Sequence, residues 1–276
     1  MDLLRYWNLR ERPFEATWDT RFFCASPDHE EALNRLLYLV GETSMNLGLL
    51  TGEIGSGKTL TRAVFAQRID AIRFQILTLE NTGVPLVELL DSILRRLDPQ
   101  VQLRGEGKLA RCEMFEQLVR KLNAGGRHLV LLLDEAQDMT PETIHELRWL
   151  TNFNGSGVSL ATLILIGQPE LRKLVVSDAA INQRVSLRFH LRPLRADDMD
   201  HYLRHRLCVA GHATGHLFSP LAALEIFNAT HGVPREVNRL AKLALEQAWV
   251  GEAAKVEASA VTAVVRDLER HQFLPV

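Results

Sequence analysis

An eight-residue glycine loop constrains this chain more than any other feature. It reads Gly52-Glu53-Ile54-Gly55-Ser56-Gly57-Lys58-Thr59. The apolar run 47–51 precedes it, and residues 60–69, which follow it, have the pattern of a helix. This order of strand, loop and helix fits the phosphate-binding pattern G-x-x-x-x-G-K-S/T in full. The sequence therefore predicts a binding site for a nucleoside triphosphate.

Each residue type in the loop has a physical role in that prediction. The glycines let the backbone curl so that its N–H groups converge on phosphate oxygens, and the following helix adds its positive end. Lys58 can reach the β- and γ-phosphates, and the Thr59 hydroxyl can bind Mg²⁺. A glycine-rich turn that binds nothing is the alternative. The residues expected to contact the nucleotide here are Gly52, Glu53, Ile54, Gly55, Ser56, Gly57, Lys58, Thr59 and Leu60.

Length and composition are those of an ordinary globular protein. The chain has 276 residues, enough for one large domain or for a core domain with a smaller companion. Its formal net charge is -2, so only local patches could attract nucleic acid or an anionic membrane. The three cysteines, Cys24, Cys112 and Cys208, form no C-x-x-C pair. Scattered thiols of this kind are typical of a reducing cytoplasm and argue against a structural zinc site.

The sequence also predicts a cytoplasmic location. Charged residues at positions 2 and 5 interrupt the apolar character of the N-terminus, which is unlike a signal peptide. The longest aliphatic runs, 129–133 and 163–166, are too short to cross a bilayer.

A pair of carboxylates indicates that the triphosphate is hydrolysed. Asp134 and Glu135 follow the buried run 129–133, which is typical of a central parallel strand. A carboxylate at the tip of such a strand can hold Mg²⁺, and a second one can polarise the attacking water. We therefore assign Asp134 to the metal and Glu135 to the general base. An acidic pair that only ends a strand is the alternative.

Four further polar residues are candidates for contacts with the nucleotide. Gln168, at the end of the strand 160–166, can face the γ-phosphate, or it can simply form the turn before Pro169. Arg184 and Arg188 can stabilise charge on the γ-phosphate of a neighbouring subunit, or they can lie on a solvated surface. Arg235 follows Pro234 at a helix start and can reach back to the nucleotide.

The order of predicted elements divides the chain into two domains. Strands alternating with helices up to residue 194, after an N-terminal lead-in, predict an α/β sheet with right-handed crossovers. From Arg195 onward, helical patterns at about 196–211, 219–230, 235–250 and 257–270 predict a small all-helical domain. The expected domains are residues 1–194 and residues 195–276.

Several short segments, with the two motifs above, resemble one family of ATPases. They include Leu9-Arg10-Glu11-Arg12-Pro13-Phe14, Leu133-Asp134-Glu135-Ala136-Gln137, Gly167-Gln168-Pro169-Glu170-Leu171, Leu217-Phe218-Ser219-Pro220 and Gly232-Val233-Pro234-Arg235. On these segments the chain resembles the AAA+ ATPases, and more narrowly the ExeA/GspA-type family with its MshM-like members. The Gly-Gln-Pro-Glu-Leu and Leu-Phe-Ser-Pro matches are the most specific.

The resemblance implies a fold, a cofactor and a set of roles. The fold is a P-loop αβα sandwich with a five-stranded parallel sheet in the order 5-1-4-3-2, followed by a helical lid. Gln168 would lie near sensor 1, Arg184 or Arg188 would be the arginine finger, and Arg235 would be sensor 2. ATP with Mg²⁺ would drive self-association into a hexamer-like ring or a helical filament. Relatives help to assemble secretion systems and type IV pili, often at the inner membrane, which implies a protein partner in such a machine.

A second group of similar ATPases leaves an alternative function open. Transposition regulators of the TniB, TnsC and MuB kind form ATP-bound filaments on DNA and act with a transposase. Six arginines could line a groove that follows a DNA backbone, namely Arg184, Arg188, Arg192, Arg195, Arg204 and Arg206. Asp197, Asp198 and Asp200 lie among them, and such a charge run is usually a solvated helix face. A nucleotide-dependent scaffold without hydrolysis is a third hypothesis, disfavoured by the intact Asp134-Glu135 pair.

Overall fold

A computed structural model describes residues 2–42, 44–103, 107–152, 154–155 and 158–272. The chain forms two compact units, and each unit is assembled from separate segments. The sheet unit consists of Glu31–Ile54 and Thr61–Leu191. The helical unit consists of Met1–Glu30, Gly55–Leu60 and Arg192–Val276, so it includes most of the glycine loop.

The sheet unit contains the predicted parallel sheet. Its strands are β1 (Leu47–Gly52), β2 (Phe74–Leu79), β3 (His128–Leu133), β6 (Ala161–Gly167) and β7 (Leu187–Leu191). They lie in the order β2-β3-β6-β1-β7, and all four strand pairs are parallel. This is the order 5-1-4-3-2 taken from the other edge, so the predicted topology is confirmed. The central strands β1 and β6 are buried along their whole length, as their aliphatic runs require. Two short strands, β4 (Asn154–Gly155) and β5 (Val158–Ser159), form a separate antiparallel pair.

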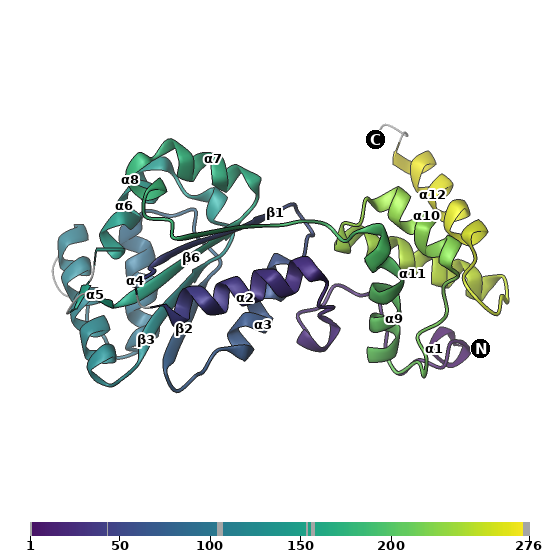
Figure 1. The fold of residues 1–276 in the computed structure, drawn as a ribbon, viewed down its shortest axis with the longest axis horizontal. Helices are drawn as coiled ribbons and strands as arrows, with labels where there is room; N and C mark the ends of the chain where they lie inside the picture. Colours follow the sequence, from purple (N-terminus) through teal and green to yellow (C-terminus); the bar gives the residue numbers. More distant parts are fainter. Residues whose placement is uncertain (1, 43, 104–106, 153, 156–157, 273–276) are drawn as a thin grey trace. The chain divides into compact units, whose positions relative to one another are not determined.

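Helices cover both faces of this sheet. One face packs in a single apolar core with residues of α4 (Leu86–Leu97), α5 (Gly107–Ala124), α6 (Pro141–Leu150), α7 (Pro169–Ser177) and α8 (Ala179–Asn182). On the other face, α2 (Pro27–Gly41) lies so close to β1 that a Cβ at Gly48 would be 2.4 Å from Leu39 Cδ2. Figure 1 shows α2 and α7 on opposite sides of the strands. The helix α3 (Lys58–Arg68) begins in the glycine loop.

The helical unit has its own apolar core. Its main helices are α9 (Met199–Val209), α10 (Pro220–Thr230), α11 (Pro234–Val250) and α12 (Ala258–Gln272). Ser219 caps α10, because its hydroxyl accepts a hydrogen bond from the Ala222 N–H at 3.2 Å and Pro220 follows it. These helices agree with the four helical patterns predicted after Arg195.

The N-terminal lead-in packs in the helical unit, although the sequence-based division grouped it with the nucleotide-binding domain. It contains α1 (Leu3–Tyr6), and its buried Trp7 and Phe14 share a core with α9, α10 and α11. The Arg206 guanidinium donates to the Pro13 carbonyl at 2.6 Å and lies over the Phe22 ring. The sequence did not indicate this placement, because apolar residues in a segment show that it is buried but not against what.

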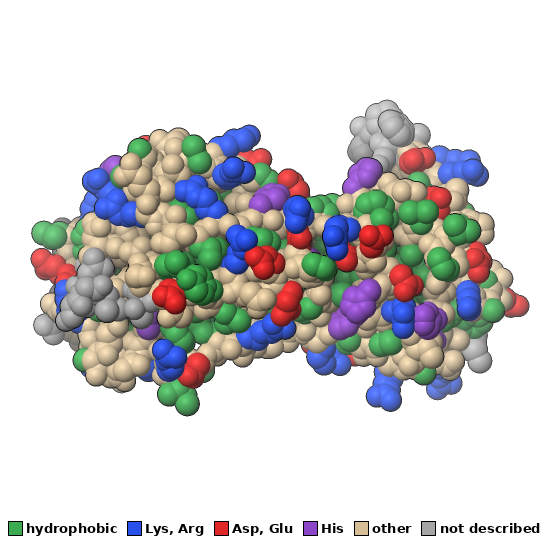
Figure 2. All heavy atoms as spheres, in the orientation of Figure 1, with side chains coloured by type: hydrophobic (Ala, Val, Ile, Leu, Met, Phe, Trp, Pro, Cys, Tyr) green, Lys and Arg blue, Asp and Glu red, His purple; other side chains and the backbone are tan. Residues whose placement is uncertain are grey.

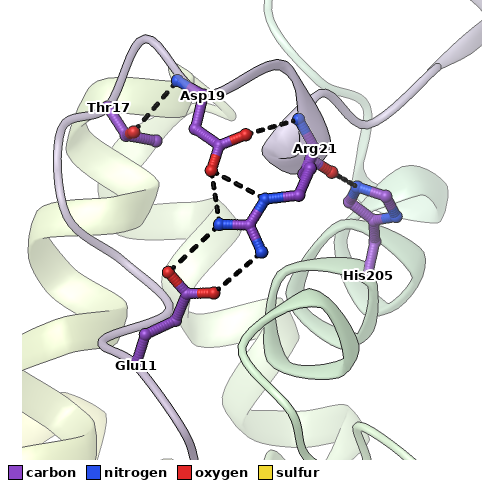
Figure 3. A network of polar contacts seen from close by, with 5 residues as sticks. All are labelled: Glu11, Thr17, Asp19, Arg21 and His205. Atoms are coloured by element: carbon purple, nitrogen blue, oxygen red, sulfur yellow. Dashed lines mark hydrogen bonds and ion pairs between the residues drawn. The ribbon is translucent and has the colours of Figure 1, made fainter.

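A polar network also fixes the lead-in within this unit (Figure 3). Arg21 forms ion pairs with Asp19 at 2.5 Å and with Glu11 at 3.1 Å, and its carbonyl lies 3.2 Å from His205 Nε2 on α9. Solvent screens these exposed and partly exposed groups, so each pair adds little to stability. Their contribution is mainly to the path of the chain between Phe14 and Phe22.

Among the described residues, no helix combines the length and the apolar character needed to cross a bilayer.

Candidate nucleotide-binding site

The glycine loop adopts a conformation that only glycine permits at two positions. Gly55 and Gly57 have φ angles of 80° and 97°. Space is restricted there as well, because a Cβ at Gly55 would lie 2.6 Å from Arg235 Cβ and one at Gly57 would lie 2.9 Å from His29 Nε2. A substitution at either position would therefore meet both backbone strain and a steric clash.

Two consecutive carbonyls of the loop accept hydrogen bonds from the helical unit. The Arg235 N–H, in the first turn of α11, donates to the Gly55 carbonyl at 3.2 Å. His29 Nε2 lies 3.1 Å from the Ser56 carbonyl oxygen. A carbonyl can only accept, so His29 Nε2 must carry the hydrogen. These contacts join the loop to residues from distant parts of the chain.

The loop residues fit a bound phosphate group. Ser56 is fully buried, and its hydroxyl has no hydrogen-bond partner within the described part of the chain. An orphaned buried hydroxyl is unusual and is explained if a ligand supplies the missing partner. Lys58 and Thr59 open α3, where the helix dipole and the lysine both favour an anion. Gly52, Glu53 and Ile54 belong to the sheet unit, at the end of β1, and Leu60 closes the loop segment of the helical unit.

At the carboxyl edge of the sheet, an arginine joins two acidic residues. Asp134 follows β3 and Glu80 follows β2, and the register Leu79↔Leu133 places these two strand ends side by side. Arg62 Nη1 lies 3.2 Å from Asp134 Oδ2, and Arg62 Nη2 lies 2.9 Å from Glu80 Oε1. Burial raises the pKa of the Asp134 carboxyl, and the Arg62 guanidinium opposes that rise. Carboxylate oxygen is the donor type that Mg²⁺ prefers, so Asp134 fits the predicted metal role.

Glu135 is held by a glutamine that also contacts the next strand. Its backbone is left-handed, with a φ of 49°, an uncommon conformation for a residue other than glycine. The Gln137 amide donates to Glu135 Oε2 at 2.9 Å, and Gln137 Oε1 accepts from the Gln168 N–H at 3.0 Å. Gly167 makes room for this contact, because a Cβ there would lie 2.5 Å from Gln137 Oε1. The structure thus joins two predicted site residues, Glu135 and Gln168, through Gln137.

The predicted arginines have separate surroundings. Arg184 is half-buried and donates to the Ala180 carbonyl at 2.8 Å and to Asn152 Oδ1 at 3.2 Å. Arg188 is exposed on the edge strand β7, and its guanidinium donates to the Asn182 carbonyl at 2.7 Å. In the helical unit, Pro234 is buried at the start of α11, and the Arg235 side chain is exposed.

Three residues with direct contacts to the site were missed in the sequence. They are His29, Arg62 and Gln137, each of which bonds to a predicted site residue. The only sequence signals are the spacing Ser26-x-x-His29, the position of Arg62 on the helix after Lys58, and the closeness of Gln137 to Glu135.

Comparison with known proteins identifies the family and the fold. The family model described as AAA domain matches residues 42–175. General secretion pathway protein A of Aeromonas hydrophila is 32% identical over 254 residues, or 91% of this chain and 46% of that protein. The chain is a GspA-like AAA domain protein. It spans about half the length of this curated relative.

Solved structures show the fold of this GspA-like protein. The ORC2 protein of Aeropyrum pernix aligns with a TM-score of 0.69 at 16% identity, covering 96% of this chain and 75% of that one. Cdc6p of Pyrobaculum aerophilum aligns with a TM-score of 0.61 at 20% identity, covering 86% of this chain and 68% of that one. RuvB of Thermotoga maritima aligns with a TM-score of 0.60 at 17% identity, covering 89% of this chain and 70% of that one. The GspA-like chain therefore has the AAA+ fold. Its match to the AAA domain model over residues 42–175 implies a P-loop NTPase.

Proposed function

We propose that this GspA-like protein binds ATP with Mg²⁺ and hydrolyses it. The observation that carries the proposal lies at the carboxyl edge of the sheet. There β1 leads into the phosphate loop, and β3, with only β6 between them, ends in Asp134 and Glu135. Ligands of open α/β sheets bind at this edge.

The residues have distinct tasks in the proposed reaction. Lys58 and the loop amides bind the phosphates, and Thr59 with Asp134 would hold Mg²⁺, which neutralises charge on the phosphate oxygens when bound. Glu135 accepts a proton from water as the water oxygen attacks the γ-phosphorus and the bond to the β–γ bridging oxygen breaks. Gln168 lies at the tip of β6 and would contact the γ-phosphate.

We further propose that the nucleotide controls self-association into a ring or a helical filament. Arg184 or Arg188 would act on the nucleotide of a neighbouring subunit, and Arg235 would act within the same chain. Residues 1–194 and 195–276 would then be the functional nucleotide domain and lid, even though the lead-in packs with the lid helices.

The proposed process is the assembly of a secretion or type IV pilus system through a protein partner. Its support is the 32% identity, over 91% of this chain, to General secretion pathway protein A. Figure 2 shows Lys and Arg side chains interspersed with Asp and Glu on the visible face, as expected for a solvated surface. The visible face therefore gives the alternative, filament formation on DNA with a transposase, no specific support.

The experiment compares the wild-type protein with Glu135→Gln. We expect the variant to bind ATP with unchanged affinity in equilibrium binding and to lose at least about 100-fold in hydrolysis rate, the scale of a lost general base. Undiminished hydrolysis would refute the role of Glu135.

The same proteins separate the two processes. In the presence of ATP, we expect no binding to duplex DNA at moderate salt. DNA binding that falls steeply as salt rises would instead support the transposition hypothesis.

A further inference from the structure

We propose that His29 is a positioning residue that aims a backbone amide of the phosphate loop at the bound phosphate. It acts on that amide through the Ser56 carbonyl. This role deepens the proposed function and depends on its ATP binding.

The argument starts from the geometry of the peptide group. In a trans peptide the C=O and N–H bonds of one plane point in opposite directions, and the described chain contains no cis peptide. The Ser56 carbonyl shares its plane with the Gly57 N–H. A hydrogen bond from His29 Nε2 on one side of the loop therefore directs the Gly57 N–H to the other side.

The neighbouring peptide is held in the same way. The Arg235 N–H binds the Gly55 carbonyl, whose plane contains the Ser56 N–H. Two successive amides are thus oriented by donors that lie outside the loop motif. Consecutive N–H groups directed by alternating backbone conformations form an anion nest, and here Gly55 and Gly57 supply the positive φ angles.

His29 is built into the unit firmly enough to act as a support. The residue is 5% exposed, and its ring meets the Phe23 ring edge-on with the ring centroids 5.8 Å apart. Its Nδ1 lies 2.7 Å from Ser26 Oγ. Because burial lowers the pKa of His29, the ring is neutral at pH 7, so Nδ1 accepts from the Ser26 hydroxyl and Nε2 donates to Ser56.

A buried histidine could instead serve only to fill space, and two substitutions separate these roles. Leucine at position 29 has a side chain of similar size but no hydrogen-bond donor. Glutamine can place an amide N–H near the position of Nε2. If donation matters, His29→Gln should retain most of the function that His29→Leu loses.

The experiment measures equilibrium binding of ADP and of ATP to wild type and variants, with circular dichroism to check folding. We expect His29→Leu to bind both nucleotides about 3- to 10-fold more weakly, the equivalent of one lost hydrogen bond. His29→Gln should remain within about 2-fold of wild type by the same reasoning. The exposed His216, in the same unit, gives the matched control His216→Leu, which should bind as wild type does.

Each other outcome has a defined meaning. The positioning role would be overturned if His29→Leu bound nucleotide as tightly as wild type. It would also be overturned if His29→Leu and His29→Gln lost the same amount of nucleotide affinity. Either result would leave the proposed ATP binding intact. If the wild type bound neither nucleotide, the proposed function would fail together with this role. Should His29→Leu not fold, Ser26→Ala still tests the proposal, since a freed ring should weaken binding about 2-fold. Unchanged affinity in that variant would overturn it.

Discussion

Replacement of Arg62 by methionine tests the acidic cluster at the carboxyl edge of the sheet. The Arg62 and Asp134 side chains are only 8% and 5% exposed, so their ion pair is buried. The second partner, Glu80, is 65% exposed. Methionine retains most of the apolar volume of arginine but leaves the Asp134 carboxylate buried without its cation.

The two ion pairs of Arg62 contribute very different energies. Removing one partner of a buried pair typically costs about 3–5 kcal/mol, because the remaining charge stays desolvated. The exposed pair with Glu80 adds at most about 1 kcal/mol. We therefore expect Arg62→Met to lower the free energy of unfolding by about 3 kcal/mol at pH 7. For a chain of this length that is a fall in melting temperature of roughly 6–12 °C.

The effect should depend on pH in a defined direction. Burial already raises the pKa of Asp134 in the folded protein, and loss of Arg62 raises it further. A carboxyl whose pKa is higher in the folded protein than in the unfolded chain stabilises the fold at pH values below the unfolded pKa. This contribution is lost as the pH rises through the folded pKa. The loss of unfolding free energy in Arg62→Met, relative to wild type, should therefore be smallest in acid and should grow as the pH rises.

The assay is thermal unfolding followed by circular dichroism, without nucleotide or Mg²⁺. Arg120 is the matched control, because it is 51% exposed and paired with Glu116 on the surface of α5, so Arg120→Met should change the melting temperature little. Adding Asp134→Asn to Arg62→Met should recover part of the loss, since the uncompensated charge is gone. A melting temperature for Arg62→Met equal to that of the control would refute this account of the cluster.

Two further predictions concern turnover. Gln137→Ala removes the link between Glu135 and Gln168, so we expect kcat to fall about 10-fold with little change in KM, the range for a misplaced catalytic group. The exposed Gln117→Ala is its control, and an unchanged kcat in Gln137→Ala would contradict the prediction. For the arginine finger, Arg184→Ala and Arg188→Ala are each mixed with the Glu135→Gln protein, and the variant that lacks the finger should regain hydrolysis in the mixture. If neither mixture regains hydrolysis, neither arginine acts across subunits.

The sequence predicted those parts of the fold that depend on local patterns. Unbroken aliphatic runs such as 129–133 predict central strands because both faces of those strands are buried. Their alternation with helices gave the α/β class, and the resemblance supplied the strand order that the structure confirms. The helices after Arg195 were also predictable, since each has an apolar face of its own.

Residues that act through tertiary contacts were not predictable in the same way. Arg62 looks like any exposed arginine on a helix until the register of β2 and β3 brings Glu80 and Asp134 together. Gln137 stands beside Glu135 in the sequence, but its bond to the Gln168 amide depends on the neighbouring strand β6. The left-handed backbone of Glu135 has no local signal either, because glutamate rarely adopts it.

The phosphate loop shows how far a motif explains its own conformation. The pattern leaves position 55 open, but the structure gives two reasons for glycine there: its φ is positive, and Arg235 occupies the space that a side chain would need. His29 and Arg235 hold successive loop carbonyls, and they come from the first turn of α2 and from the first turn of α11 in the predicted lid. Loop shape is thus determined jointly by the motif and by these two segments. It follows that substitutions at His29 or around Arg235 should alter nucleotide affinity even though the eight motif residues are intact.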